Sequence, residues 1–229
     1  MIRAILFDKD GTFTDFRATW EGWLPGMIDA LAREAEIDPE VIADILGFDR
    51  ASGRLSPDGA FVTAPKMATA QALAAVTHWP RHRIFTWITE RERQAEQVLV
   101  TPLAPYLSAL RARGLRLGVL TNADRAEASH QLEASGALPL LDRLICCDDG
   151  FGAKPDPRGA ADFADALGLA RHEVVLVGDG RPDMAAAAGA GLRAVGVLTG
   201  TLSAADLAPP AEAVLPDITH LPGWLSSAG

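Results

Sequence analysis

Two aspartates stand directly after the first apolar run of the chain. Asp8 and Asp10 follow Ile2–Phe7 and are two residues apart, so at the end of a strand both side chains point to the same side. Two carboxylates held that close repel each other unless they share a proton or a cation lies beside them. Asp179, which follows a later apolar run, adds a third carboxylate. Carboxylate oxygens with room for water suit Mg²⁺, so we expect a magnesium site that substrate phosphate could complete.

Other polar groups that suit a phosphate follow the remaining apolar runs. Lys154 is one of only three lysines in a chain whose other cations are arginines, which indicates that a compact positive charge is needed there. Beside a carboxylate and a phosphate, its ammonium would neutralise the transferring oxygens. Thr121 and Asn122 offer a hydroxyl and backbone N–H groups to an anion, and Gly11 lets the backbone approach one closely. A loop lysine alone is more often simply solvated, but together these residues predict a phosphate site.

Short apolar runs separated by helical patterns position these residues. Each run is apolar on both faces, which is typical of a parallel strand that is buried on both sides. The runs are Ile2–Phe7, Arg116–Leu120, Arg143–Cys147, Glu173–Val177 and Arg193–Leu198. The helical stretches, ended by glycine and in places begun by proline, are Leu103–Arg113, Ala126–Ser135, Pro157–Leu167 and Pro182–Ala190. This alternation predicts a doubly wound parallel α/β sheet, in which ligands bind outside the carboxyl ends of the strands.

One long interval interrupts the alternation of strands and helices. Between residues 16 and 100 only helical patterns occur, with segments at Pro39–Leu46, Pro65–Val76 and Pro80–Val100. We therefore expect an all-helical domain at 16–100, inserted into a Rossmann-like core made of 1–15 and 101–229. A last edge strand is expected within Ala213–Ile218. Four tryptophans of the insertion are expected to lie in its own core or at its interface with the catalytic core rather than to form a lid over substrate. They are Trp20, Trp23, Trp79 and Trp87.

The composition limits the partners and the compartment. The chain has 229 residues, of which 48% are hydrophobic, so it can bury a large core. A net charge of -9 disfavours a nucleic-acid backbone or an anionic membrane surface as partner. Cys146 and Cys147 are adjacent and make no disulfide framework, and Met1–Phe7 is too short for a signal peptide or a membrane span. We expect a cytoplasmic monomer or homodimer that acts on a small phosphorylated metabolite, with no nucleic acid or membrane as partner.

Four short motifs resemble those of the haloacid dehalogenase (HAD) superfamily in its phosphatase form. They are Phe7–Thr12, Leu120–Asn122, Lys154–Pro155 and Gly178–Asp183. Any one of them would be a weak signal, but their order and spacing fit over the whole chain. The resemblance implies a Rossmann-like catalytic core with a helical cap inserted after the first motif. Phosphoglycolate phosphatase-like and β-phosphoglucomutase-like members have such caps, which close over the core and choose the substrate.

The resemblance also implies a role for each site residue. It assigns Asp8 as the nucleophile and Asp10 as the general acid and then the general base. The Mg²⁺ ion would be held by a carboxylate oxygen of Asp8, the backbone carbonyl of Asp10 and the carboxylate of Asp179. Asp183 would act mainly through water or by orienting Asp179. The phosphoryl oxygens would be held by Thr121, Asn122 and Lys154.

The acceptor of the phosphoryl group and the substrate stay open. Dehalogenases and phosphonoacetaldehyde hydrolases lack a carboxylate at the position of Asp10, so both are set aside. We therefore expect Lys66, in the insertion, to be a surface lysine and not a Schiff-base residue. A phosphomutase of the β-phosphoglucomutase type and a non-catalytic phosphate-binding module remain as alternatives. The expected function is Mg²⁺-dependent hydrolysis of a small phosphomonoester, phosphoglycolate-like or a sugar phosphate, through a phospho-aspartate on Asp8.

Overall fold

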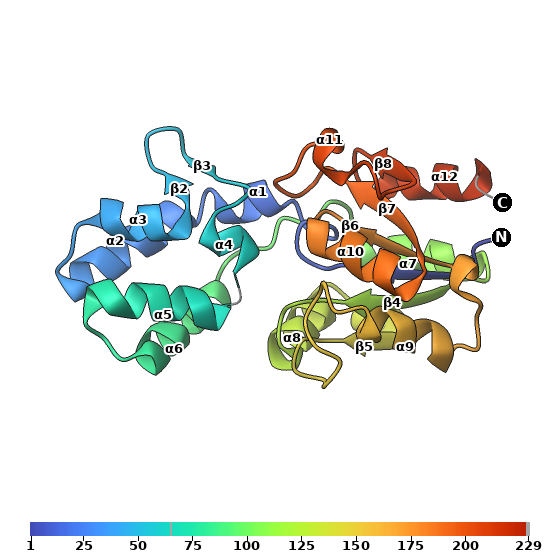
Figure 1. Cartoon of the computed structure of the whole chain (residues 1–229), viewed down its shortest axis with the longest axis horizontal. Helices are drawn as coiled ribbons and strands as arrows, with labels where there is room; N and C mark the ends of the chain where they lie inside the picture. The colour runs from blue at the N-terminus through green and yellow to red at the C-terminus, as the bar shows by residue number, and fades with distance from the viewer. Residues whose placement is uncertain (65, 228–229) are drawn as a thin grey trace. The chain divides into compact units, whose positions relative to one another are not determined.

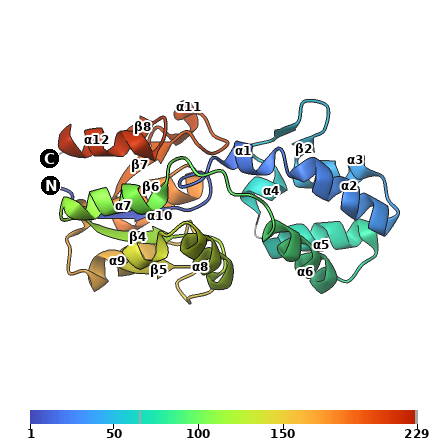
Figure 2. The same ribbon diagram turned by 180° about the vertical axis from the view of Figure 1, so that it is seen from behind.

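The computed structural model describes residues 1–64 and 66–227 and divides into two compact units. The first unit consists of Met1–Asp15 and Leu99–Gly229, and the second of Phe16–Val98. The chain therefore leaves the first unit soon after its first strand and returns to it about eighty residues later. Figures 1 and 2 show the elements of each unit from opposite sides.

A six-stranded parallel sheet forms the centre of the first unit. Its strand order is β5-β4-β1-β6-β7-β8, and every neighbouring pair is parallel. The strands are β1 (Ala4–Phe7), β4 (Arg116–Leu120), β5 (Arg143–Ile145), β6 (Val174–Gly178), β7 (Arg193–Val197) and β8 (Ala213–Leu215). All five apolar runs are confirmed as strands, with ends that differ by at most two residues, and β8 is the expected edge strand. The predicted doubly wound α/β architecture is confirmed.

Helices cover both faces of this sheet, which explains why its strands are almost entirely apolar. Phe7 packs in one cluster with α7 (Leu103–Ala112), α8 (Arg125–Ala134) and α12 (Leu221–Ser227). The preceding residue, Leu6, packs in the opposite cluster with the helices of the other face. These are α9 (Arg158–Ala166), α10 (Arg181–Ala190) and α11 (Ala204–Leu207). In Figure 1 helix α10 lies nearer the viewer, and in Figure 2 helix α7 does. Short 3-10 turns complete this unit at Leu138–Leu140, Arg171–Glu173 and Ile218–His220.

The second unit is mainly helical, but it also contains a small hairpin. Strands β2 (Phe48–Asp49) and β3 (Arg54–Leu55) pair in an antiparallel way, with Phe48 opposite Leu55 and both buried. The expectation of an all-helical insertion is wrong at this point, because two-residue strands are too short to leave an alternating pattern. The helices are α1 (Phe16–Trp20), α2 (Leu24–Ala35), α3 (Pro39–Leu46), α4 (Ala60–Thr63), α5 (Lys66–Thr77) and α6 (Arg81–Glu92).

The predicted helical segments of this unit agree with the structure to different degrees. Helix α3 has the predicted bounds, since Asp38 caps its first turn and Gly47 ends it with a left-handed backbone. Helix α5 matches the second segment, although Pro65 lies outside the described residues. Helix α6 ends at Glu92, eight residues before the predicted end. Helix α2 was not among the predicted segments.

The tryptophans of the second unit are packing residues, and Lys66 forms an ion pair. Trp20 and Trp87 are buried in its apolar cluster, and Trp23 and Trp79 pack against that cluster, as expected. The Lys66 Nζ atom lies 2.6 Å from Glu92 Oε2, and Glu92 is buried. Lys66 thus lies at the surface with a partly exposed side chain, and its ammonium neutralises a carboxylate that the fold removes from water.

The remaining expectations concern thiols and membranes. Cys146 is buried and Cys147 is half-buried, and both are free thiols that follow β5. Burial raises the pKa of both thiols, which keeps them in the unreactive protonated form. Among the described residues, no helix combines the length and the apolar character that a membrane span needs.

Candidate active site

The polar residues singled out in the sequence lie at the carboxyl edge of the six-stranded sheet. Asp8 directly follows β1, Thr121 directly follows β4 and Asp179 directly follows β6, while Lys154 lies in the loop after β5. Strand β1 lies between β4 and β6 in the sheet and is paired in register with both. Residues at the ends of these three strands therefore lie side by side, which is the convergence that the sequence pattern predicted.

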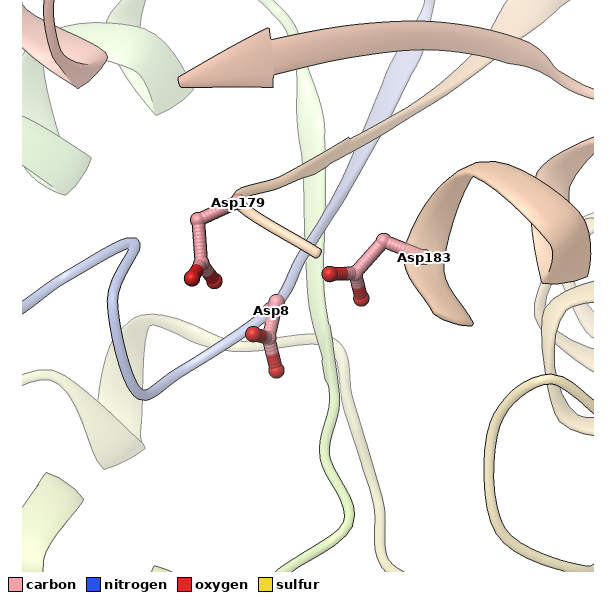
Figure 3. Close-up of side chains that lie close together, drawn as sticks. All are labelled: Asp8, Asp179 and Asp183. Atoms are coloured by element: carbon pink, nitrogen blue, oxygen red, sulfur yellow. The ribbon is translucent and has the colours of Figure 1, made fainter. Parts of the chain in front are cut away.

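Three carboxylates converge at the centre of this edge. One carboxylate oxygen from each of Asp8, Asp179 and Asp183 lies within 4.8 Å of the other two. Figure 3 shows them arriving from the end of β1, the end of β6 and the first turn of α10. The exposed fraction is 7% for Asp8 and 2% for Asp183, and Asp179 is half-buried. The fold thus takes three acidic groups largely out of water in one place.

Lys154 is the cation that the structure places in this cluster. Its Nζ atom donates to Asp8 Oδ1 at 2.5 Å and to Asp183 Oδ1 at 2.6 Å, and the residue is 7% exposed. The side-chain amide of Asn122 fixes the backbone of Lys154. Asn122 Nδ2 donates to the Lys154 carbonyl at 3.0 Å, and the Lys154 N–H donates to Asn122 Oδ1 at 2.7 Å. The Asn122 amide therefore positions the lysine.

Burial and charge repulsion perturb the acidity of the cluster. Burial, followed by the charge of Asp183, raises the pKa of Asp8 to about 7, although Lys154 lowers it in part. Burial and the charges of Asp8 and Asp183 raise the pKa of Asp179 well above its ordinary value. Burial opposes the charged form of Lys154, but the charges of Asp183 and Asp8 outweigh it and raise the pKa of the ammonium. The site is thus short of positive charge.

The donor set fits a hard divalent cation. With every group ionised, three carboxylates and one ammonium leave an excess of two negative charges. Carboxylate oxygens that face one another at this spacing are the ligands that Mg²⁺ takes, together with water and substrate phosphate. A divalent cation would favour the ionised form of Asp8 and Asp179, against the effect of burial. The residues present therefore suit the expected magnesium site.

Two glycines hold the Asp179 carboxylate from opposite parts of the chain. A Cβ atom on Gly11 would lie 2.4 Å from Asp179 Oδ2, and one on Gly200 would lie 1.8 Å from the same oxygen. Gly11 also has a φ of +76°, which favours glycine on backbone grounds. The Thr199 hydroxyl donates to the Gly11 carbonyl at 2.6 Å and so joins the two glycine loops. The loop after β7 is therefore part of the site.

Asp10 stands apart from the three-carboxylate cluster. Its carboxylate accepts a hydrogen bond of 2.6 Å from the Nζ atom of Lys9, and its side chain is 29% exposed. Lys9 itself is 3% exposed and also donates to Gln131 Oε1, on helix α8.

The Thr121 side chain is buried, and its Oγ1 atom accepts from the N–H of Ala123 at 3.1 Å.

Sequence reasoning missed four residues that the structure adds to this site. They are Lys9, Gln131, Thr199 and Gly200. Lys9 stood inside the first motif, and a lysine among apolar and acidic residues was a signal that could have been followed. The other three lie in no motif, and nothing in the sequence marked them before the topology was known.

Comparison with known proteins places the chain in a family. Residues 2–191 match the family model of haloacid dehalogenase-like hydrolases. The phosphoglycolate phosphatase of Rhodospirillum rubrum is 30% identical over 98% of this chain and 91% of its own length. The validoxylamine A 7'-phosphate phosphatase of Streptomyces hygroscopicus subsp. limoneus is 37% identical over 54% of this chain and 57% of its own.

A solved structure supports the fold over nearly the whole chain. A haloacid dehalogenase-like family protein of Streptococcus pneumoniae superposes with a TM-score of 0.72 at 16% identity, over 98% of both chains. Identity this low speaks for the fold alone. The match of the family model and the match to the relative from Rhodospirillum rubrum also show the family, because both cover most of the sequence. The chain therefore belongs to the haloacid dehalogenase-like hydrolase family, and the expected hydrolytic enzyme class is confirmed.

Proposed function

We propose that this enzyme is a Mg²⁺-dependent phosphatase that hydrolyses a small phosphomonoester through a phospho-aspartate on Asp8. The observation that supports it most is the contact of Asp8 with Lys154 beside Asp179, at the end of the central strand. A nucleophilic carboxylate needs a nearby positive charge to let a phosphate anion approach. Asp10, two residues further on, supplies a second carboxylate outside the cluster, where it is available for proton transfer.

In the proposed reaction Asp8 attacks the phosphorus atom in line with the leaving oxygen. Lys154 stabilises the charge on the phosphoryl oxygens, and Asp10, which enters this step in its protonated form, gives its proton to the departing alkoxide. Asp10 then takes a proton from water, whose oxygen attacks the phosphorus of the acyl phosphate and releases phosphate and free Asp8. When bound, Mg²⁺ neutralises negative charge on the phosphate and orients it.

The magnesium ligands in this proposal come from two strand ends. Asp8 and Asp179 would supply one carboxylate oxygen each, and Asp10 its backbone carbonyl. Asp183 accepts from Lys154 and from the N–H of Gly180 at 3.0 Å, so its carboxylate is already engaged by two donors. This engagement supports a role for Asp183 in orienting the site instead of direct binding.

We propose phosphoglycolate or a comparably small phosphomonoester, including sugar phosphates, as the substrate. The relative from Rhodospirillum rubrum, which matches over 91% of its own length, is called a phosphoglycolate phosphatase, and the relative with the shorter match is called a validoxylamine A 7'-phosphate phosphatase. We assign the choice among such substrates to the inserted unit 16–98, as a cap domain. A cytoplasmic location, with the enzyme as a monomer or homodimer, belongs to the same proposal.

Release of inorganic phosphate from a panel of substrates tests the proposal. The panel contains phosphoglycolate, sugar phosphates, nucleotides, pyrophosphate and p-nitrophenyl phosphate, each assayed with Mg²⁺ and with excess chelator. We expect Mg²⁺-dependent turnover of at least one small phosphomonoester and no turnover by Asp8→Asn. Asp156→Asn, which changes a half-buried aspartate of the Lys154 loop outside the carboxylate cluster, is the matched control and should remain active.

Two results would contradict the proposal. Asp8→Asn with activity within about tenfold of the wild type would remove Asp8 from the nucleophile role, since an amide cannot form the phospho-aspartate. Isomerisation of β-glucose 1-phosphate much faster than phosphate release, with a trace of the 1,6-bisphosphate present, would establish a mutase instead.

A further inference from the structure

Lys9 occupies an unusual place for a lysine. It stands between Asp8 and Asp10 on the loop that leaves β1, and its side chain is only 4% exposed. A buried ammonium is costly unless hydrogen-bond acceptors surround it. Its Nζ atom has two acceptors, Asp10 Oδ1 at 2.6 Å and Gln131 Oε1. The fold thus buries one positive charge next to Asp10 and supplies it with two hydrogen-bond acceptors.

Further hydrogen bonds within the first unit hold the two partners of this contact, Gln131 and Lys9. Gln131 lies on α8, and its Nε2 atom donates to Glu127 Oε1 one turn earlier at 3.4 Å. Glu127 is in the first turn of that helix, where Asp124 caps the N–H of Glu127 at 2.9 Å. The backbone of Lys9 is also fixed, because its carbonyl accepts from the N–H of Phe13 at 2.9 Å. Lys9 is therefore held at both its backbone and its ammonium.

We propose that Lys9 is a positioning residue that holds the Asp10 carboxylate in place for proton transfer, with Gln131 as its anchor on α8. The inference rests on the proposed role of Asp10 as general acid and base. A short, partly exposed aspartate on a loop would otherwise sample several rotamers. A general acid must lie within hydrogen-bond reach of the leaving oxygen, and a displacement of about 1 Å lowers rates on the order of a hundredfold.

The dependence on the leaving group separates this role from a merely structural one. An alkoxide needs a proton from Asp10 as it departs, whereas p-nitrophenolate is stable enough to leave without one. The constant kcat/KM covers the steps up to phosphoryl transfer, so it does not include the later hydrolysis of the phospho-aspartate. A variant with a misplaced Asp10 therefore loses kcat/KM for an alkyl phosphate much more than for p-nitrophenyl phosphate.

The kinetic test compares Lys9→Met and Gln131→Met with the wild type on an alkyl phosphate, phosphoglycolate, and on p-nitrophenyl phosphate. For Lys9→Met we expect kcat/KM to fall on the order of a hundredfold with the alkyl phosphate and less than about tenfold with p-nitrophenyl phosphate. Gln131→Met should show the same selectivity with a smaller loss, since the contact of Lys9 with Asp10 remains. The control Arg3→Met removes an exposed ion pair at the start of β1 and should leave the ratio unchanged. Equal losses for the two substrates in Lys9→Met would overturn the proposal.

A measurement without turnover tests the contact itself. With only three lysines in the chain, the ¹⁵N signals of their side-chain ammonium groups can be assigned by single substitutions. We expect Asp10→Asn to shift the Lys9 signal and to leave the Lys66 signal in place, because Lys66 is paired with Glu92 in the other unit. An unchanged Lys9 signal would overturn the proposal even if Lys9→Met does not fold. A wild type that cleaves neither substrate would refute the proposed function, and the ammonium signal would still decide the contact.

Discussion

Replacement of Asp8 by Asn should stabilise the metal-free protein at about pH 8, although it destroys the proposed nucleophile. Asp8 is buried with two other carboxylates and one lysine, and its pKa is raised from 3.8 to about 7. A carboxyl group with a raised pKa binds its proton more tightly in the folded protein than in the unfolded chain. The contribution of Asp8 to stability is therefore greatest below pH 3.8, its pKa in the unfolded chain. It falls as the pH rises from 3.8 through about 7, its pKa in the folded protein.

The size of the effect follows from the shift. A rise of about three pKa units at about 1.4 kcal/mol each corresponds to a loss of about 4 kcal/mol above pH 7. The raised value already includes the favourable contact with Lys154, so the loss is a net one for the ionised group. The carboxylates of the cluster titrate together, so protonation of Asp179 already removes part of the repulsion in the wild type. The substitution of Asp8 therefore gains less than the full amount. We therefore expect Asp8→Asn to gain between about 2 and 4 kcal/mol, or at least about 4 °C in Tm for a domain of this size.

Thermal unfolding of chelator-treated protein at about pH 5 and about pH 8 measures this effect. The wild type should lose stability between the two pH values, and Asp8→Asn should lose much less. Addition of Mg²⁺ at about pH 8 should raise the Tm of the wild type but hardly that of the variant. Asp156→Asn is the control, since the hydrogen bond from the Arg158 side chain lowers the pKa of that aspartate and its removal should give no stabilisation. A lower Tm of metal-free Asp8→Asn at about pH 8 would refute the idea that these carboxylates destabilise the empty site.

Three other predictions concern neighbouring residues. Asp179→Ala should raise the Mg²⁺ concentration needed for activity more than Asp183→Ala, for which a change of about ten- to a hundredfold is typical; the reverse order would make Asp183 the direct ligand. Lys154→Ala should lower kcat, because it removes about 3 kcal/mol of transition-state stabilisation. A change in KM alone would mean that Lys154 only binds the substrate. Gly200→Ala should weaken Mg²⁺ binding measured by calorimetry, because its Cβ would lie 1.8 Å from Asp179 Oδ2. Gly223→Ala, where a Cβ meets no atom within 4 Å, is the control, and equal Mg²⁺ affinities would contradict this prediction.

The central sheet was predictable because burial leaves a strong pattern. Strands such as β4 and β6 are covered by helices on both faces, so almost every residue in them is apolar. The hairpin β2–β3 left no comparable pattern, since its stability comes from one buried pair of side chains, Phe48 and Leu55. Helix α2 has a regular apolar face, formed by Leu24, Met27, Ile28, Leu31 and Ala32, but Pro25 and Gly26 in its first turn are residues that usually interrupt a helix, so this segment was missed.

The site was predictable where a residue directly follows a strand. Asp8, Thr121 and Asp179 are such residues, and the order of the strands alone brings them together. The contact of Lys9 with Gln131 joins positions 122 residues apart in the chain, and it depends on the side of the sheet on which α8 packs. Gly200 touches Asp179 only because the loop after β7 folds over the end of β6. Contacts of this kind follow from tertiary packing, which no local pattern encodes.

The two lysines of the core divide the carboxylates of the site into groups with different needs. Lys9 neutralises Asp10 one to one, so this carboxylate requires no further cation and can serve proton transfer. Lys154 neutralises Asp8 only in part, since it is shared with a second carboxylate. Asp179 has no ion pair with a lysine or arginine among residues 1–64 and 66–227, and glycine backbone encloses it instead. The negative charge that no cation neutralises is therefore greatest between Asp8 and Asp179, and that is where we expect Mg²⁺ to bind.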